Sequence, residues 1–112
     1  IDRFVDSTIA YQHYGLGVNL GLIKYINNYL LKKISVNYTF LNIVNQKNMF
    51  LRLKKRKNLN RYDRFKSNFY KKVQNGFLKI ARNKKNYQII DSNLDINLNK
   101  TIILNSIKKL IK

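Results

Sequence analysis

Apolar residues recur at helical spacing along much of the chain. Phe65, Phe69, Val73, Phe77 and Ile80 are separated by three or four residues, a spacing that places them on one face of a helix. The pattern predicts an amphipathic helix from residue 66 to about residue 81, with this face packed in the core. Shorter patterns of the same kind predict helices over residues 6–14, 19–31, 45–53 and 98–111.

Two short segments have the composition of strands instead. Residues 39–44 are β-rich and mostly apolar along their length, which is typical of a parallel-sheet strand that is covered on both faces. Residues 87–91 are expected to form a second short strand. Because the two strands alternate with helices, the pattern predicts a layered α/β domain.

Polar residues and glycines mark several expected boundaries. Asp6 or Ser7 is expected to cap the first helix, which should end before a turn at residues 15–17. Asn45 is expected to cap the helix that follows the first strand. The basic, turn-prone stretch 54–60 is predicted to be a mobile loop.

The composition is that of one folded domain, or of part of one. Hydrophobic residues make up 45% of the 112 residues, enough for a packed core. Because the chain opens on Ile1 without a polar leader, we expect a fragment. No apolar run reaches the roughly 18–20 residues that a membrane-spanning helix needs, so we expect a cytoplasmic protein without a membrane partner. The absence of Cys and the single His13 argue against disulfides, thiolate nucleophiles and zinc sites.

The charge is strongly basic, with 23 Lys and Arg against five acidic residues and a net charge of +18. This balance suggests a polyanionic partner, so a small basic RNA-binding protein of ribosomal type is one alternative. Two features weigh against a nucleic-acid partner. The basic residues are spread along most of the chain, with one denser run at residues 54–64, and the abundant Lys, Asn, Ile, Tyr and Phe indicate an A/T-rich coding bias.

Three segments carry a family resemblance. The opening Asp2-Arg3-Phe4-Val5-Asp6-Ser7-Thr8-Ile9-Ala10-Tyr11-Gln12 resembles the thymidylate kinase motif in which a strand ends in Asp-Arg-Tyr/Phe and is followed by Ser-x-x-Ala-Tyr-Gln. Arg56, Asn60-Arg61-Tyr62-Asp63 and the helix after them resemble the lid region of that family, and Ile89-Ile90-Asp91 resembles its final strand. The resemblance covers almost the entire chain.

The resemblance implies a P-loop nucleoside-monophosphate-kinase-like α/β fold, a three-layer sandwich that is truncated at the N-terminus. Residues 1–112 would be the C-terminal part of a single thymidylate kinase domain, with the lid at about 54–64. The implied reaction transfers the γ-phosphoryl group of ATP to dTMP and yields dTDP, with Mg²⁺ as cofactor and a homodimer as a possible assembly. A related deoxynucleoside or nucleotide kinase is a nearer alternative than RNA binding.

The resemblance also implies roles for residues near the N-terminus. Arg3 would grip the dTMP phosphate and act in catalysis, since a guanidinium matches phosphate oxygens. Asp2 would hold the magnesium shell, through water. Tyr11 would lie against the sugar and favour deoxyribose, and Gln12 would reach the thymine. Thr8 is a lower-ranked dTMP contact, because its side chain could instead only cap the helix.

In the lid, the resemblance implies that Arg61 meets the transferring phosphates as a second catalytic cation and that Arg56 stacks on adenine. Departures from the family pattern are His13 in place of Gly, Leu16 in place of Arg and Asn42 in place of Asp. No Gly-x-x-x-x-Gly-Lys-Ser/Thr occurs, so the phosphate-binding loop is not in this chain. We therefore expect negligible kinase activity from these residues alone, and a gap in the sheet.

Overall fold

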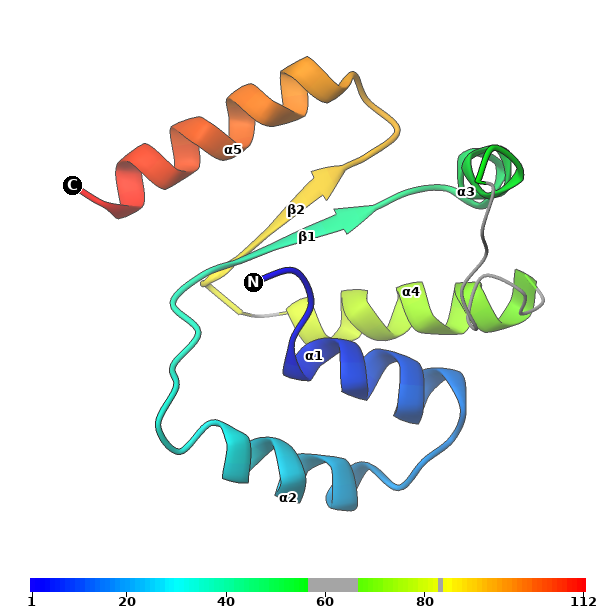
Figure 1. The fold of residues 1–112 in the computed structure, drawn as a ribbon, viewed down its shortest axis with the longest axis vertical. Helices are drawn as coiled ribbons and strands as arrows, with labels where there is room; N and C mark the ends of the chain where they lie inside the picture. The colour runs from blue at the N-terminus through cyan, green and yellow to red at the C-terminus, as the bar shows by residue number, and fades with distance from the viewer. Residues whose placement is uncertain (57–66, 83) are drawn as a thin grey trace.

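The structure, a computed structural model, describes residues 1–56, 67–82 and 84–112. A parallel sheet of two strands, β1 and β2, lies between α5 on one side and α4 with α1 on the other, and α2 lies outermost (Figure 1). The elements in chain order are α1 Val5–Thr8, the π-helix η1 Ile9–Gly15, α2 Leu20–Leu30, β1 Thr39–Ile43, α3 Gln46–Lys54, α4 Ser67–Ala81, β2 Tyr87–Asp91 and α5 Ile96–Leu110. The predicted alternation of helices with parallel strands is confirmed.

The register of the sheet determines which backbone groups each strand presents to its neighbour. Thr39 is opposite Tyr87 and Ile43 is opposite Asp91. At the two ends of the ladder, the Thr39 N–H donates to the Asn86 carbonyl at 2.8 Å, and the Ser92 N–H donates to the Ile43 carbonyl at 2.7 Å. Because successive residues of a strand present their backbone groups to opposite sides, positions 39, 41 and 43 face β2.

The strands are covered less completely than the sequence predicts. Leu41 and Ile90 are buried, but Asn42 and Ile89 are exposed. The expectation that the strand at residues 39–44 is covered on both faces is therefore wrong at Asn42, which the described helices leave exposed.

The core lies where η1 packs against α4. Ala10, Phe69 and Val73 are buried together, and Tyr11, Tyr70, Phe77 and Ile80 surround them. Two glycines permit this close approach. A Cβ at Gly15 would lie 2.7 Å from the Phe69 ring, and one at Gly76 would lie 2.7 Å from Tyr14. The apolar face predicted for α4 is thus confirmed at its described positions, while Phe65 and residue 66 lie outside the described residues.

The helix α2 begins as predicted at Asn19, whose side chain accepts the Leu22 N–H. Ile23 and Asn27 are buried, and the Asn27 amide donates to the Val5 carbonyl at 3.3 Å. Five apolar residues of the helix are exposed around this buried stripe: Leu22, Tyr25, Ile26, Tyr29 and Leu30.

The helix α5 is tied to β2 by side-chain hydrogen bonds. Asp95 caps its first turn by accepting from Asn97 and Leu98, so the helix begins two residues before the predicted position. The Asn99 amide donates to the Asp91 carbonyl at 2.8 Å, and the Ser106 hydroxyl bonds to Gln88 at 2.7 Å.

The predicted caps of the first helix are wrong. Phe4 occupies the N-cap position of α1 and no side chain caps the helix. The Ser7 N–H already donates to the Phe4 carbonyl at 3.0 Å, so Asp6 and Ser7 lie inside the first turn. The cap that the sequence predicts at Asn45 is confirmed, since its side chain accepts the Asn48 N–H at 2.8 Å.

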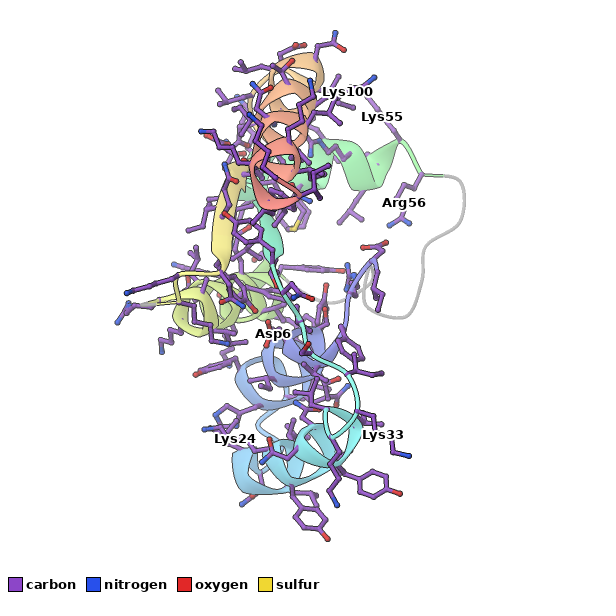
Figure 2. All side chains as sticks on the ribbon, turned by 90° about the vertical axis from the view of Figure 1, so that its left-hand side faces the viewer. Asp6, Lys24, Lys33, Lys55, Arg56 and Lys100 are labelled. Atoms are coloured by element: carbon purple, nitrogen blue, oxygen red, sulfur yellow. The ribbon has the colours of Figure 1, made fainter. Side chains whose placement is uncertain are left out.

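Basic side chains are distributed over the molecule. The labelled lysines lie on or beside α2, α3 and α5, at opposite ends of the view in Figure 2. Of the predicted loop 54–60, residue 54 closes α3 and positions 57–60 lie outside the described residues. None of the helices in the described ranges combines the length and apolar character needed to cross a membrane.

Candidate functional site

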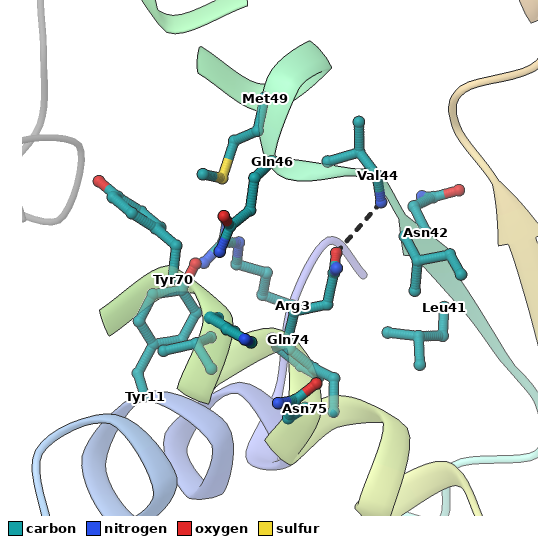
Figure 3. A pocket seen from close by; sticks show the side chains of 14 residues that line it. Arg3, Tyr11, Leu41, Asn42, Val44, Gln46, Met49, Tyr70, Gln74 and Asn75 are labelled. Atoms are coloured by element: carbon teal, nitrogen blue, oxygen red, sulfur yellow. Dashed lines mark hydrogen bonds between the residues drawn. The ribbon is translucent and has the colours of Figure 1, made fainter. Parts of the chain in front are cut away.

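A cavity of about 400 Å³ lies between the N-terminal segment, the carboxyl end of β1, the start of α3 and one flank of α4. In Figure 3, Tyr11 lies on the side of the cavity away from Leu41 and Val44, and Arg3 lies between them. The carboxyl ends of parallel strands are where ligands bind in open α/β sheets. The polar and aromatic side chains that line the cavity include Arg3, Tyr11, Asn42, Gln46, Tyr70 and Gln74.

Arg3 has a backbone conformation that is uncommon outside glycine, with a φ of 64°. Arg3 is exposed, and its guanidinium carbon lies 5.1 Å from the centroid of the Tyr11 ring. This geometry is a cation–π contact. The turn at Arg3 and the contact with Tyr11 together place a guanidinium at the cavity.

Tyr11 is held by the core beneath it. Its ring lies 6.0 Å from that of Phe69 and 6.1 Å from that of Phe77, the second in an edge-on arrangement. Aromatic pairs of this kind favour a defined ring orientation. The ring is therefore a fixed platform under the Arg3 guanidinium, because two residues of α4 support it.

The carboxyl end of β1 is fixed by amide side chains. The Val44 N–H donates to Gln74 of α4 at 3.1 Å, the hydrogen bond drawn in Figure 3. The Asn45 N–H donates to the Asn93 side chain at 3.1 Å, and the Asn93 amide in turn donates to the Asp91 carboxylate at 2.8 Å. These bonds hold the ends of both strands and the start of α3 in one arrangement around the cavity.

The structure brings together some of the residues predicted for the site and leaves others apart. Arg3 and Tyr11 share the cavity. Asp2 and Thr8 are exposed, Gln12 is half-buried, and these three do not line it. Arg56 is exposed just beyond α3, and it is not among the lining residues either.

Arg61 and most of the lid predicted at about 54–64 lie outside the described residues. The described lining residues include no carboxylate, and they include the cations Arg3 and Lys71. Cations beside an aromatic ring in a cavity of this size are suited to an anionic ligand that carries a flat group.

Sequence reasoning missed the contribution of α4 to the site. Tyr70 and Gln74 are one helical turn apart and lie beside the apolar face of that helix. Their spacing could have identified them, but polar residues that flank an apolar face also fit an ordinary solvated surface. No group of three or more His, Asp or Glu side chains is placed for metal binding within the ranges that the structure describes.

Comparison with known proteins identifies the chain. The family model of thymidylate kinase matches residues 1–103. The thymidylate kinase of Sulfurihydrogenibium sp. (strain YO3AOP1) is 38% identical over 112 residues, an alignment that covers 96% of this chain and 52% of that protein. The thymidylate kinase of Wolbachia pipientis wMel is 40% identical over 80 residues, covering 71% of this chain and 39% of that protein.

The thymidylate kinase of Ehrlichia ruminantium (strain Gardel) is 36% identical over 113 residues, covering 96% of this chain and 52% of that protein. The chain thus spans about half the length of the Sulfurihydrogenibium and Ehrlichia relatives, each of which aligns with 96% of it. Because the family model covers nearly all of the 112 residues, the chain belongs to the thymidylate kinase family.

Proposed function

We propose that these residues form part of a dTMP kinase, which transfers the γ-phosphoryl group of ATP to dTMP and yields dTDP. The observation that carries this proposal is the Arg3 guanidinium, held 5.1 Å over the Tyr11 ring at a cavity by the carboxyl end of β1. The family match over residues 1–103 supports the same reaction. An alternative role in RNA binding is not favoured, since the family assignment accounts for the motifs.

Arg3 is proposed to bind the phosphate of dTMP and to stabilise charge during transfer. Phosphoryl transfer requires mainly the alignment of two nucleotides and the neutralisation of charge on the transferred group. The Tyr11 ring supports the guanidinium from one side, so the Arg3 side chain loses less conformational freedom when phosphate binds. Tyr11 is also proposed to contact the sugar and exclude a 2′-hydroxyl group.

The remaining roles rest on the motif alone. Thr8 and Gln12 are proposed as further dTMP contacts, with Gln12 near the thymine. Arg56 is proposed to stack on adenine, and Arg61 to act as a second catalytic cation in a lid at about 54–64. These lid residues would meet the ATP phosphates after the substrates bind.

Mg²⁺ is proposed as the cofactor, with Asp2 as its contact in this chain. One or two carboxylates and the substrate phosphates are the usual ligands of Mg²⁺ in kinases, and an exposed carboxylate beside Arg3 fits that donor set. The bound ion would neutralise phosphate charge.

The proposed fold of the whole protein is a P-loop nucleoside-monophosphate-kinase sandwich, in which residues 1–112 belong to a single domain. These residues alone are expected to have negligible kinase activity, because they contain no phosphate-binding loop. A homodimer is proposed as the assembly, and the exposed apolar face of α2 is compatible with it.

The test is a nuclear magnetic resonance titration of the chain with dTMP and with UMP. We expect dTMP to shift the signals of Arg3 and Tyr11 at a lower concentration than UMP does. Arg3→Ala should weaken dTMP binding about tenfold or more, since a hydrogen bond to a charged group contributes about 1.5–3 kcal/mol. Arg82→Ala, an exposed arginine that does not line the cavity, is the matched control. Equal responses to both nucleotides, or an unchanged affinity in Arg3→Ala, would contradict the proposal.

A further inference from the structure

A second cavity, of about 430 Å³, lies between the end of η1, the turn at residues 15–17 and α4. Besides the turn, the residues that line it are Tyr14, Lys72, Asn75 and Lys79. We refer to it as the outer cavity. Asn75 also lines the candidate dTMP cavity, but the two lysines and Tyr14 do not. The outer cavity is therefore a separate place on the molecule.

The outer cavity lies on the side of α4 that faces away from the sheet. In Figure 1, α4 lies between the strands and α1. Gln74 reaches the sheet, where its side chain accepts the Val44 N–H at 3.1 Å. At about 100° per residue, Lys72 and Lys79 are turned by about 160° and 140° from Gln74. A sheet that extends further in the plane of β1 and β2 would stay on the Gln74 side, so it would leave the outer cavity uncovered.

Lys72 and Lys79 share one side of α4. Their separation of seven residues places them about 20° apart around the helix and about 10 Å apart along it. Both side chains are exposed and long, so their ammonium groups can converge on one anion between them. Among the described residues, no carboxylate lines the outer cavity. Its positive charge is therefore not neutralised from within.

The Tyr14 ring is held in a defined position at the outer cavity. It packs over Gly76, where a Cβ would approach it to 2.7 Å. The His13 ring lies edge-on to it at 4.8 Å, and the Lys79 ammonium lies 5.4 Å from its centroid. Because a carbonyl only accepts, His13 Nδ1 carries the proton that it donates to the Val18 carbonyl at 2.8 Å. This bond joins the ring stack to the turn.

The turn leaves the outer cavity accessible but offers it few backbone donors. Gly17 has a φ of 79°, and a Cβ built there would have no atom within 4 Å. The N–H groups of Leu16, Gly17 and Val18 already donate to carbonyls of η1. The donors available to a ligand are therefore side chains, two ammonium groups and the Asn75 amide.

We propose that the outer cavity binds an oligophosphate chain, of the kind found in a nucleoside triphosphate or in inorganic tripolyphosphate, between the Lys72 and Lys79 ammonium groups. An anion with charge along its length can contact two cations that are spaced along a helix, whereas a single phosphate offers less charge over a shorter span. The volume lies within the range of small-molecule sites. This inference concerns a site apart from the dTMP cavity and does not rest on the dTMP reaction.

The experiment is a nuclear magnetic resonance titration of the chain with tripolyphosphate at about 0.15 M salt, which weakens attraction to the overall charge. We expect saturable shifts at the side chains of Tyr14, Lys72 and Lys79. A parallel titration with GTP distinguishes the two sources of the chain. Tighter binding of GTP would identify a nucleotide as the ligand, and equal binding would identify the phosphate chain alone. No dTMP is present, so failure here is distinct from failure of the dTMP proposal.

Substitutions then test the two cations. Lys72→Met and Lys79→Met should each weaken tripolyphosphate binding about threefold or more, since each removes one exposed ion pair with the ligand. Lys79→Arg keeps the charge and should retain binding. Lys71→Met is the matched control, because it removes the same charge from the neighbouring position of α4 and lines the other cavity. Its affinity for tripolyphosphate should stay within about twofold of the wild type.

Three results would overturn the proposal. The first is the absence of saturable shifts at Tyr14 and the two lysines. The second is an equal loss of affinity in Lys71→Met and Lys72→Met, which would mean that the anion responds to the overall charge of the chain. The third is a set of shifts confined to Arg3 and Tyr11, which would place the anion in the other cavity. Circular dichroism of each variant confirms that these exposed substitutions leave the fold in place.

Discussion

The pKa of the Asp6 carboxyl is raised in the folded protein. This carboxyl lies in the first turn of α1 and is half-buried, and this burial raises its pKa above the usual value of 3.8, while the Lys84 ammonium lowers it in part. Burial raises a carboxyl pKa because the charged form loses hydration. The folded state therefore holds the Asp6 proton more tightly than the unfolded chain does.

This shift predicts how Asp6 affects stability. Between the unfolded pKa and the raised folded pKa the native state binds more protons, so the free energy of unfolding decreases as pH rises through that window. In Asp6→Asn this decrease should disappear, leaving the variant more stable than the wild type above the window. Chemical denaturation at a series of pH values would measure the free energy of unfolding of both proteins. If this free energy falls with pH in Asp6→Asn as steeply as in the wild type, the raised pKa of Asp6 is not the cause.

Lys84 provides a separate check on the cause. Lys84→Met removes the ammonium that lowers the Asp6 pKa, so the pKa of Asp6 should rise further. Carbon-detected titration of the Asp6 carboxyl would follow this directly. Lys100→Met, on α5, is the matched control and should leave the Asp6 pKa in place.

At the scale of elements, the contact between η1 and α4 depends on Gly76. A Cβ at this position would lie 2.7 Å from the Cβ and Cδ2 atoms of Tyr14. Gly76→Ala should therefore destabilise the fold by about 1–3 kcal/mol through overpacking, although alanine favours a helix by about 1 kcal/mol over glycine. Thermal and urea unfolding would measure the difference.

A double-mutant cycle identifies the clash. In a Tyr14→Gly background the same Gly76→Ala substitution should cost much less, because the Cβ and ring atoms that obstruct the new methyl group are absent. If Gly76→Ala is equally costly in both backgrounds, the contact with Tyr14 is not its cause.

The elements that the sequence predicts well are those with local signals. The four-residue period of Phe69, Val73 and Phe77 identifies α4, and Asn19 identifies the start of α2. The caps proposed at Asp6 and Ser7 fail because a helix can begin without a side-chain cap when the backbone closes its own first turn. Local signals of this kind therefore locate helices better than they locate helix ends.

The site is predicted less completely than the elements. Arg3 and Tyr11 follow from a motif, and the structure places both at one cavity. The bond from Val44 to Gln74 joins residues 30 positions apart, and the support of Tyr11 by Phe77 is similarly long-range. Such contacts depend on how β1 and α4 pack, and neither element carries a sequence signal for the other.

At the scale of the whole molecule, surface charge and exposed apolar area act in opposite directions. Because the net charge is +18, the basic residues within one chain repel one another, and separate copies of the chain repel each other. The exposed apolar residues of α2 and α5, among them Tyr25, Tyr29 and Leu110, favour association. Which effect prevails depends on ionic strength, because salt screens charge and leaves apolar contacts in place.

Salt should therefore stabilise the isolated chain. The screening length falls from about 30 Å at 0.01 M salt to about 3 Å at 1 M, so repulsion among the lysines weakens as salt is added. The melting temperature should rise by several degrees over this range, by about the same amount in sodium chloride as in potassium chloride. Circular dichroism melts at low protein concentration measure this, with light scattering to follow association. A melting temperature independent of salt would mean that the basic residues lie too far apart to interact, and that the charge of the chain does not limit its stability.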